Sequence, residues 1–169
     1  SIMVGTGNGA ENGILIKDAE SLERAHKLQL VVVDKTGTLT EGKPTVTDYL
    51  TVRGSANSNE IRLLQLAAAI ERNSEHPLAE AVVQYAESQG ISQQKMAGAT
   101  DFEAVVGRGV QGQVKGHLVQ IGTERWMQIL GVDTTALQSH RQAWESAAKT
   151  TAWMAVDGTD EGLCGMSEA

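Results

Sequence analysis

The sequence has little cysteine, no long apolar run and no excess of basic residues, and each of these absences excludes a class of protein. Its single cysteine, Cys164, excludes an internal disulfide framework and a metal site built from several thiolates, as is typical of a reducing compartment. No run approaches the roughly 18 apolar residues that span a bilayer, so we expect this polypeptide alone to be soluble. The N-terminus shows no basic segment followed by an apolar stretch, so we predict no signal peptide.

The net charge of −7 argues against a nucleic-acid partner, because no basic stripe is available to neutralise a phosphate backbone. The four histidines, at positions 26, 76, 117 and 140, lack the spacing of metal ligands. The sequence does contain enough apolar material for a packed core, since 41% of its 169 residues are hydrophobic. We therefore expect one medium-sized domain, alone or with part of a second.

The strongest chemical pattern lies between Val31 and Thr40. Three consecutive valines are typical of a strand buried on both faces of a parallel sheet, and they end in Asp34. A carboxylate at that end can attack phosphorus if amides and a cation offset the charge of the transferring phosphoryl group. Lys35 offers the cation, and the loop that follows offers hydroxyls and amides. The simpler alternative is that Asp34 only caps a strand-to-loop turn.

Residues 34–40 read DKTGTLT, which resembles without a mismatch the phosphorylation loop of P-type cation-transporting ATPases. The resemblance implies catalytic roles for Asp34, Lys35 and Thr36: Asp34 forms an aspartyl-phosphate, and its side chain holds Mg²⁺ together with the carbonyl of Thr36. Haloacid-dehalogenase-type phosphatases, which these pumps resemble in this core, carry an acid two residues after the nucleophile to activate water. Because Thr36 stands there instead, we expect a longer-lived phosphoenzyme, which suits a pump.

The second informative stretch is a corner between two helices, both of which are predicted from apolar residues at helical spacing. The first helix can be capped by Asn57 or Ser58 and ends near Asn73. Pro77 suits the first turn of the second helix, which stops at Gly90.

His76 lies at that corner, where an imidazole can stack on a base, and the carboxylate of Glu71 can accept from an exocyclic amine. A histidine beside a proline is otherwise an ordinary turn residue. Residues 74–77, SEHP, are similar to the histidine–proline signature of the nucleotide-binding domain in heavy-metal P-type ATPases. In that family this histidine and a glutamate five residues before it line the adenine pocket, which implies the same role for His76 and Glu71.

A pair of glycines, Gly107 and Gly109, follows a predicted strand over residues 101–106. Because glycine lacks a Cβ, the backbone there can approach a ring or phosphate closely, although a bulge or tight turn needs glycine equally. The family resemblance implies that this pair contacts nucleotide and extends the site to Val110 and Gly122. Family members usually carry asparagine after the last of these glycines, and the residue at position 123, a threonine, departs from that pattern.

The sequence therefore predicts an α/β (α+β) fold: a mostly antiparallel sheet flanked by helical hairpins, plus an incomplete haloacid-dehalogenase-like phosphorylation segment. Strands are expected over residues 45–52, 101–106, 110–114, 117–121, 150–158 and 162–166, and helices over 18–28 and 135–149 and after the cap at position 123. The glycine-rich residues 1–16 leave little prospect of a stable helix. We expect Trp144 to anchor the core and His140 to be packed or solvated. The Val31–Asp34 strand should be poorly supported, since its parallel neighbours are missing.

The resemblance covers nearly all of the chain and implies two parts. Residues 1–44 correspond to the segment after the last core membrane helix and the first part of the phosphorylation domain, and residues 45–169 to the nucleotide-binding domain. The implied parent is an ATP- and Mg²⁺-dependent pump whose remaining phosphorylation, actuator and transmembrane domains are the partners of this segment at the cytosolic face of a membrane. A copper chaperone is a further expected partner, through other domains.

The transported ion and two alternative functions stay open at this point. Residues 10–17 and 22–27 look most like copper-transporting members, so copper(I) is the expected ion, with zinc, cadmium or silver as alternatives. The fragment can instead be a nucleotide-binding module without activity of its own, or an autonomous haloacid-dehalogenase-type phosphatase.

Overall fold

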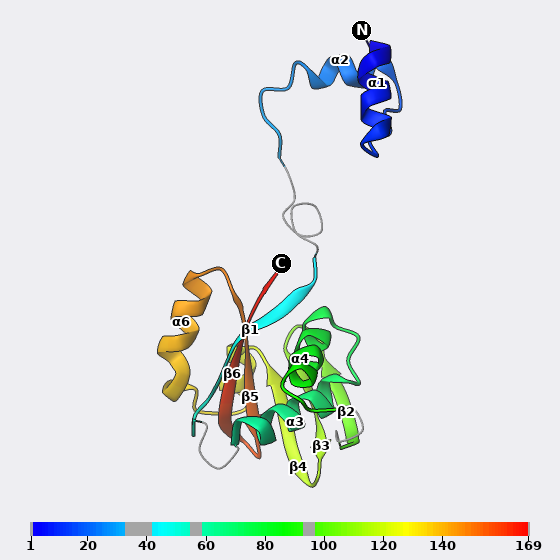
Figure 1. The fold of residues 1–169 in the computed structure, drawn as a ribbon. Coiled ribbons are helices and arrows are strands. Elements are labelled where there is room, and N and C mark those ends of the chain that lie inside the picture. The colour runs from blue at the N-terminus through cyan, green and yellow to red at the C-terminus, as the bar shows by residue number, and fades with distance from the viewer. Residues whose placement is uncertain (1, 33–41, 55–58, 93–96, 169) are drawn as a thin grey trace. The chain divides into compact units, whose positions relative to one another are not determined.

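The computed structural model describes residues 2–32, 42–54, 59–92 and 97–168 (Figure 1). The chain separates into two compact units, Ser1–Lys35 and Thr36–Ala169. Among the described residues, no helix is long and apolar enough to cross a membrane.

The first unit holds two helices, α1 (Ile2–Glu11) and α2 (Ala19–Ala25). The second of these was predicted, and it begins where the Asp18 carboxylate accepts a hydrogen bond of 2.6 Å from the Ser21 amide. The expectation of no helix in the opening residues is wrong. The α1 helix forms despite its glycines and ends at Glu11, two residues before Gly13, whose φ of +77° provides the left-handed conformation that commonly follows a helix.

The predicted buried strand is wrong for Val31 and Val32. Both residues have no regular secondary structure, and they are 67% and 88% exposed. The six strands of the described sheet all come from later in the chain, so these valines have no described strand to pair with. Val33 and Asp34 lie outside the described residues.

The second unit is built on one six-stranded sheet in which every neighbouring pair is antiparallel, which confirms the predicted, mostly antiparallel sheet. The strand order is β1-β6-β5-β4-β3-β2. The strands are β1 (Pro44–Thr51), β2 (Ala99–Val105), β3 (Gly109–Val114), β4 (His117–Gly122), β5 (Thr150–Val156) and β6 (Thr159–Glu168). The predicted hairpin between β3 and β4 turns at Lys115 and Gly116, whose φ values of +52° and +80° suit a tight two-residue turn.

The helices of this unit follow the predicted pattern, except that the last one begins as a short 3₁₀ turn. They are α3 (Asn59–Glu71), α4 (Pro77–Ser88), α5 (Glu124–Ile129), η3 (Thr135–Leu137) and α6 (Gln138–Ser146). Pro77 occupies the first turn of α4, and Thr123 caps α5. The predicted caps of α3, Asn57 and Ser58, lie outside the described residues.

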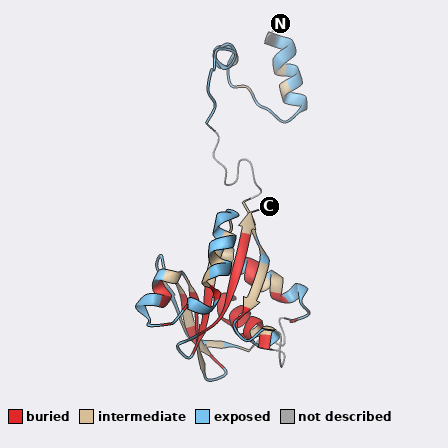
Figure 2. Cartoon of the chain, turned by 90° about the vertical axis from the view of Figure 1, so that its left-hand side faces the viewer, coloured by how far each residue is buried: buried red, intermediate tan, exposed pale blue. Residues whose placement is uncertain are grey.

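Two helical layers cover opposite faces of the sheet, and β5 contributes side chains to the apolar cluster under each layer (Figures 1 and 2). Met154 and Val156 join the cluster under α3 and α4, whereas Trp153 and Ala155 join the cluster with α5 and η3. This alternation follows from the two-residue period of a strand. Trp144, the predicted core anchor, is only partly buried and packs against the edge of the second cluster.

Candidate functional site

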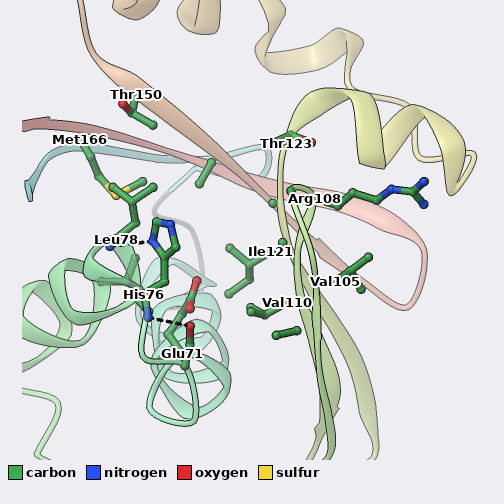
Figure 3. Close-up of a pocket in the computed structure, with 18 of the residues that line it drawn as sticks. Glu71, His76, Leu78, Val105, Arg108, Val110, Ile121, Thr123, Thr150 and Met166 are labelled. Atoms are coloured by element: carbon green, nitrogen blue, oxygen red, sulfur yellow. Dashed lines mark hydrogen bonds between the residues drawn. The ribbon is translucent and has the colours of Figure 1, made fainter.

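A pocket of about 530 Å³ lies where β3 begins, β4 ends, β5 begins and β6 ends, beside the corner between α3 and α4 (Figure 3). Most of its wall is apolar, and its polar groups come from separate elements. Its lining consists of Glu71, Ser74, His76, Leu78, Ala79, Val82, residues 104–110, Ile121, Gly122, Thr123, Thr150, Thr151, Ala152 and Met166. An apolar hollow with a few convergent polar groups is the usual form of a small-molecule site.

The six residues predicted to bind nucleotide all line this one pocket. They are Glu71, His76, Gly107, Gly109, Val110 and Gly122. The three predicted catalytic residues, Asp34, Lys35 and Thr36, lie outside the described residues. The described part of the site is therefore the binding pocket, and the phosphorylation loop is represented by its sequence alone.

His76 caps α4 with its own imidazole. Its Nδ1 accepts a hydrogen bond of 3.2 Å from the Leu78 amide, directly after the proline that opens the helix. Because Nδ1 is an acceptor, the neutral ring carries its proton on Nε2. The residue is exposed, and the ring projects into the pocket between Leu78 and Ile121 in Figure 3. It can thus stack on a flat ligand and donate one hydrogen bond.

Glu71 ends α3 and is 8% exposed. Burial raises the pKa of its carboxyl to about 7, since water is removed from the charged form. Its backbone carbonyl accepts a hydrogen bond of 2.9 Å from the Ser74 amide, and its side chain lines the pocket (Figure 3). A carboxyl with this pKa is divided between its two protonation states near neutral pH, so it can accept from an amine or donate to a ring nitrogen.

The glycines owe their identity to backbone geometry. A Cβ on Gly109 would lie 2.1 Å from the carbonyl oxygen of Ile121, and one on Gly122 would lie 2.2 Å from that of Arg108. Gly107 has a φ of +68° and open space around its missing Cβ. The close crossing of β3 and β4 and the tight turn before β3 thus require these glycines, so they shape the pocket wall whether or not they contact a ligand.

Sequence reasoning did not identify the wall made by Thr150, Thr151, Ala152 and Met166. These residues come from the start of β5 and the end of β6. The period-2 pattern of each strand shows which residues share a face, but only the strand order brings that face to Glu71. Thr123 also lines the pocket, and its hydroxyl accepts a hydrogen bond of 3.3 Å from the Trp126 amide.

The arrangement fits a flat heteroaromatic group with a polar extension. Leu78, Val110 and Ile121 offer apolar contact to a ring, and Glu71 offers an edge-on hydrogen bond. The polar edge with Thr123 and Thr150 lies away from Glu71 in the view of Figure 3. A ligand of this form can therefore place its ring against His76 and its polar part toward the threonines.

Comparisons with known proteins agree on one group of relatives. A family model described as haloacid dehalogenase-like hydrolase matches residues 28–163. The chain is 56% identical over 158 residues to the protein named "Probable copper-transporting ATPase PacS" of Synechococcus elongatus, covering 94% of this chain and 20% of that protein. The chain thus spans about a fifth of the length of this relative.

Two solved structures show the same fold. One is a zinc-transporting PIB-type ATPase in its E2.Pi state, with a TM-score of 0.78, 32% identity, and 99% of this chain and 26% of that chain covered. The other is the N-domain of HMA6, a copper-transporting P-type ATPase, with a TM-score of 0.58, 26% identity, and 74% of this chain and 99% of that chain covered. The second match shows that most of this chain corresponds to a domain studied as a separate piece.

Proposed function

Because this chain belongs to the haloacid dehalogenase-like hydrolase family, we propose that it is the ATP-binding segment of a P-type ATPase that moves copper(I) across a membrane. The observation that carries this proposal is that one pocket brings Glu71 and His76 together with the turn at Gly107. Similarity to proteins named for copper transport supports copper(I), and the zinc-transporting structure makes zinc the alternative. The segment would work at the cytosolic face, with the other phosphorylation, actuator and transmembrane domains as its partners. A copper chaperone would meet the pump through those other domains.

The adenine of ATP would lie between the His76 ring and the apolar wall that includes Ile121. Glu71, when ionised, would accept a hydrogen bond from the exocyclic amine. Stacking and apolar contact would contribute to the affinity for the base. The buried Glu71 carboxyl would contribute selectivity, because a base that lacks the matching donor leaves this carboxyl without a hydrogen bond. Gly107, Gly109, Gly122 and Val110 would form the wall beside the nucleotide.

Phosphoryl transfer would use Asp34. One carboxylate oxygen of Asp34 attacks the γ-phosphorus of ATP, the bond from this phosphorus to the β,γ-bridging oxygen breaks, and ADP leaves. Lys35 would offset the charge on the transferring group. The proposed ligands of Mg²⁺, the Asp34 side chain and the Thr36 carbonyl, lie outside the described residues; when bound, the metal would neutralise phosphate charge.

Neither alternative is favoured. A phosphatase of this family needs an acid two residues after its nucleophile, and position 36 is threonine. The relatives are named as ATPases, which favours an enzyme over a nucleotide-binding module for the whole protein of which this chain would be a segment. In this proposal the isolated chain binds ATP with little turnover, because Asp34 and the pocket belong to parts that meet by closure in a larger protein.

An amide NMR titration of the chain with ATP, first without and then with Mg²⁺, tests the binding role. We expect shifts at Glu71, His76, Gly107 and Gly109. His76→Asn should weaken ATP binding because it removes the ring while keeping a side chain that can cap α4. His140→Asn, at an exposed position that does not line the pocket, is the matched control. Equal affinity of the two variants would contradict the assignment of His76.

The phosphorylation role can be tested in a chimaera, in which this chain replaces the matching segment of full-length PacS. We expect the chimaera to form an acid-stable phosphoenzyme from radiolabelled ATP when copper(I) is supplied. Asp34→Asn should abolish the label, whereas Asp101→Asn at an exposed position should keep it. Label that persists in Asp34→Asn would exclude Asp34 as the nucleophile. Phosphoenzyme formation that is stimulated by zinc and not by copper(I) would identify zinc as the transported ion instead.

A further inference from the structure

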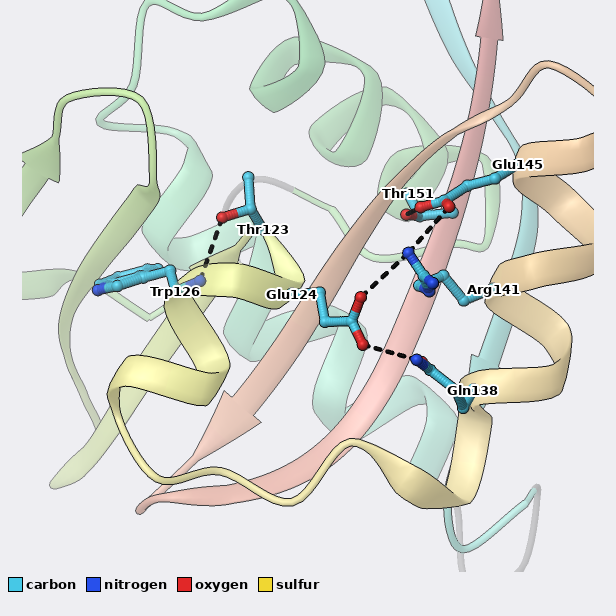
Figure 4. A network of polar contacts seen from close by, with 7 residues as sticks. All are labelled: Thr123, Glu124, Trp126, Gln138, Arg141, Glu145 and Thr151. Carbon is cyan, nitrogen blue, oxygen red and sulfur yellow. Dashed lines mark hydrogen bonds and ion pairs between the residues drawn. The ribbon is translucent and has the colours of Figure 1, made fainter.

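A chain of charged and polar side chains runs along the face of the sheet that carries α6 (Figure 4). One end of it, Thr151, is also a pocket-lining residue. The centre of the network is Arg141, which is 21% exposed. One guanidinium nitrogen, Nη1, lies 3.0 Å from Glu124 Oε2 and 2.9 Å from Glu145 Oε2. Arg141 does not itself line the pocket. It is therefore a cation shared by two carboxylates outside the binding cavity.

Each of these carboxylates is linked to an element of the pocket wall. Glu145 Oε1 accepts a hydrogen bond of 2.9 Å from the Thr151 hydroxyl, at the start of β5. Glu124 is the first residue of α5, directly after Thr123 at the end of β4. The Thr151 side chain points to α6, so its neighbour Thr150 faces the pocket. Arg141 thus connects the start of β5, next to Thr150, with the start of α5, next to Thr123.

The network is separable from the general attachment of α6. The helix also packs through Trp144 against the second apolar cluster, and Lys149 just after it pairs with Asp48 of β1. Removing Arg141 would leave the carboxylates of Glu124 and Glu145 facing each other with their shared cation gone. The Glu124 side chain is 17% exposed and the Glu145 side chain 42% exposed, so solvent screens part of their mutual repulsion. The remainder favours movement of the two groups apart, and these groups contact the start of β5 and the start of α5.

We propose that Arg141 is a positioning residue for nucleotide binding, which acts through Glu145 and Glu124 on the polar edge formed by Thr150 and Thr123. This inference rests on the proposed function, in which adenine lies by Glu71. The ribose and phosphates then extend toward that edge, which lies on the other side of the pocket in Figure 3. Arg141 would set the affinity for this part of the ligand without touching it.

A double-mutant cycle on the ATP dissociation constant tests the link. Arg141→Met should weaken ATP binding by about threefold to tenfold. Thr151→Val removes only the hydroxyl that Glu145 holds, and it should weaken binding in the same direction. If Arg141 acts through Thr151, the double variant should bind ATP no worse than Arg141→Met alone. The proposal would be overturned if the double variant lost affinity by the product of the two single fold-changes. It would also be overturned if Arg141→Met bound ATP as tightly as the unsubstituted chain.

Two further variants separate positioning from stability. Arg53→Met breaks another arginine–glutamate pair, with Glu161 at 3.6 Å, among residues that do not line this pocket. It should lower the melting temperature and leave ATP affinity unchanged. Arg141→Lys keeps a cation between the carboxylates and should restore part of the affinity. If Arg53→Met weakens ATP binding as much as Arg141→Met, the effect is general destabilisation and the inference fails.

The outcomes also distinguish this inference from the proposed function. Failure of the unsubstituted chain to bind ATP would overturn both. Binding by the unsubstituted chain together with unchanged affinity in Arg141→Met would overturn only the role of Arg141. The expected result is measurable ATP binding by the unsubstituted chain, weakened in Arg141→Met and partly restored in Arg141→Lys.

Discussion

Valines of the two units behave in opposite ways. Val31 and Val32 of the first unit are 67% and 88% exposed, whereas Val114 and Val119 of the second are 1% and 0% exposed. The residue type and its preference for strands are the same. The second pair has neighbouring strands on both sides and a helical layer against it, and the described residues supply neither to the first pair. Strand preference is thus a fit to a packed surface and does not create that surface.

The largest effect that tests this comparison is expected from Trp153→Ala. Trp153 is fully buried in the second unit, and its loss should lower the free energy of unfolding by about 3–5 kcal/mol. Val32→Ala in the first unit should change it by less than about 0.5 kcal/mol. Urea unfolding followed by fluorescence and circular dichroism measures both. Trp153→Phe is the matched control, because it keeps a ring and removes a buried indole N–H that has no hydrogen-bond partner among the described residues.

A smaller effect is expected from the pH dependence of Glu71. Since its pKa rises from 4.5 to about 7 on folding, the native state holds a proton that the unfolded chain releases. The free energy of unfolding should therefore fall as pH increases from about 4.5 to 7, by roughly 3 kcal/mol. Glu71→Gln should flatten that decline. Burial also raises the pKa of Asp160 to about 7, so Asp160→Asn should remove a second part of the slope. An unchanged slope in both variants would contradict this origin.

A stabilising change is expected at Ala148, which follows α6 with a φ of +59°. An L-residue with a Cβ is strained in this left-handed region, and glycine is not. Ala148→Gly should raise the free energy of unfolding by about 1 kcal/mol, measured by thermal unfolding. Ala147→Gly, one residue earlier at a φ of −88°, should not raise the free energy of unfolding. Equal effects of the two changes would show that strain is absent.

The smallest effect on global unfolding is expected from Asp18→Ala. Hydrogen bonds from Ser21 lower the pKa of Asp18, the opposite direction to Glu71 in the second unit. The contribution of this cap is present at neutral pH and is lost as pH falls through the lowered pKa. The variant should reduce the helical signal of α2 and leave the main unfolding transition in place. A shift of the main transition would mean that the two units unfold together.

Local chemistry explains what could be predicted from the sequence. Pro77 and Gly90 bound α4, Thr123 caps α5, and Lys115 with Gly116 forms the hairpin turn, because each feature depends on a few neighbouring residues. The α1 helix was missed because a count of glycines gives only a weak preference, which its terminal glycine and side-chain hydrogen bonds offset.

One wall of the candidate site was not predicted. Glu71 and His76 were found from a local signature, but the opposite wall with Thr150 and Met166 depends on β6 lying between β1 and β5. The predicted anchor Trp144 is less buried than Trp153, since the strand that carries Trp153 is covered by helices on both faces. Such differences arise from contacts between segments far apart in the chain, which no local pattern contains.

The pairing of β1 with β6 has a consequence for how this unit can be carried by a larger protein. Pro44, at the start of the sheet, lies opposite Glu168, near its end. Neighbouring strands are only about 5 Å apart, so chain arriving at one of these residues and chain leaving the other run side by side. The two connections of this unit to a host domain would therefore lie close together. The host chain could then fold around them at an entropic cost similar to that of closing a short loop.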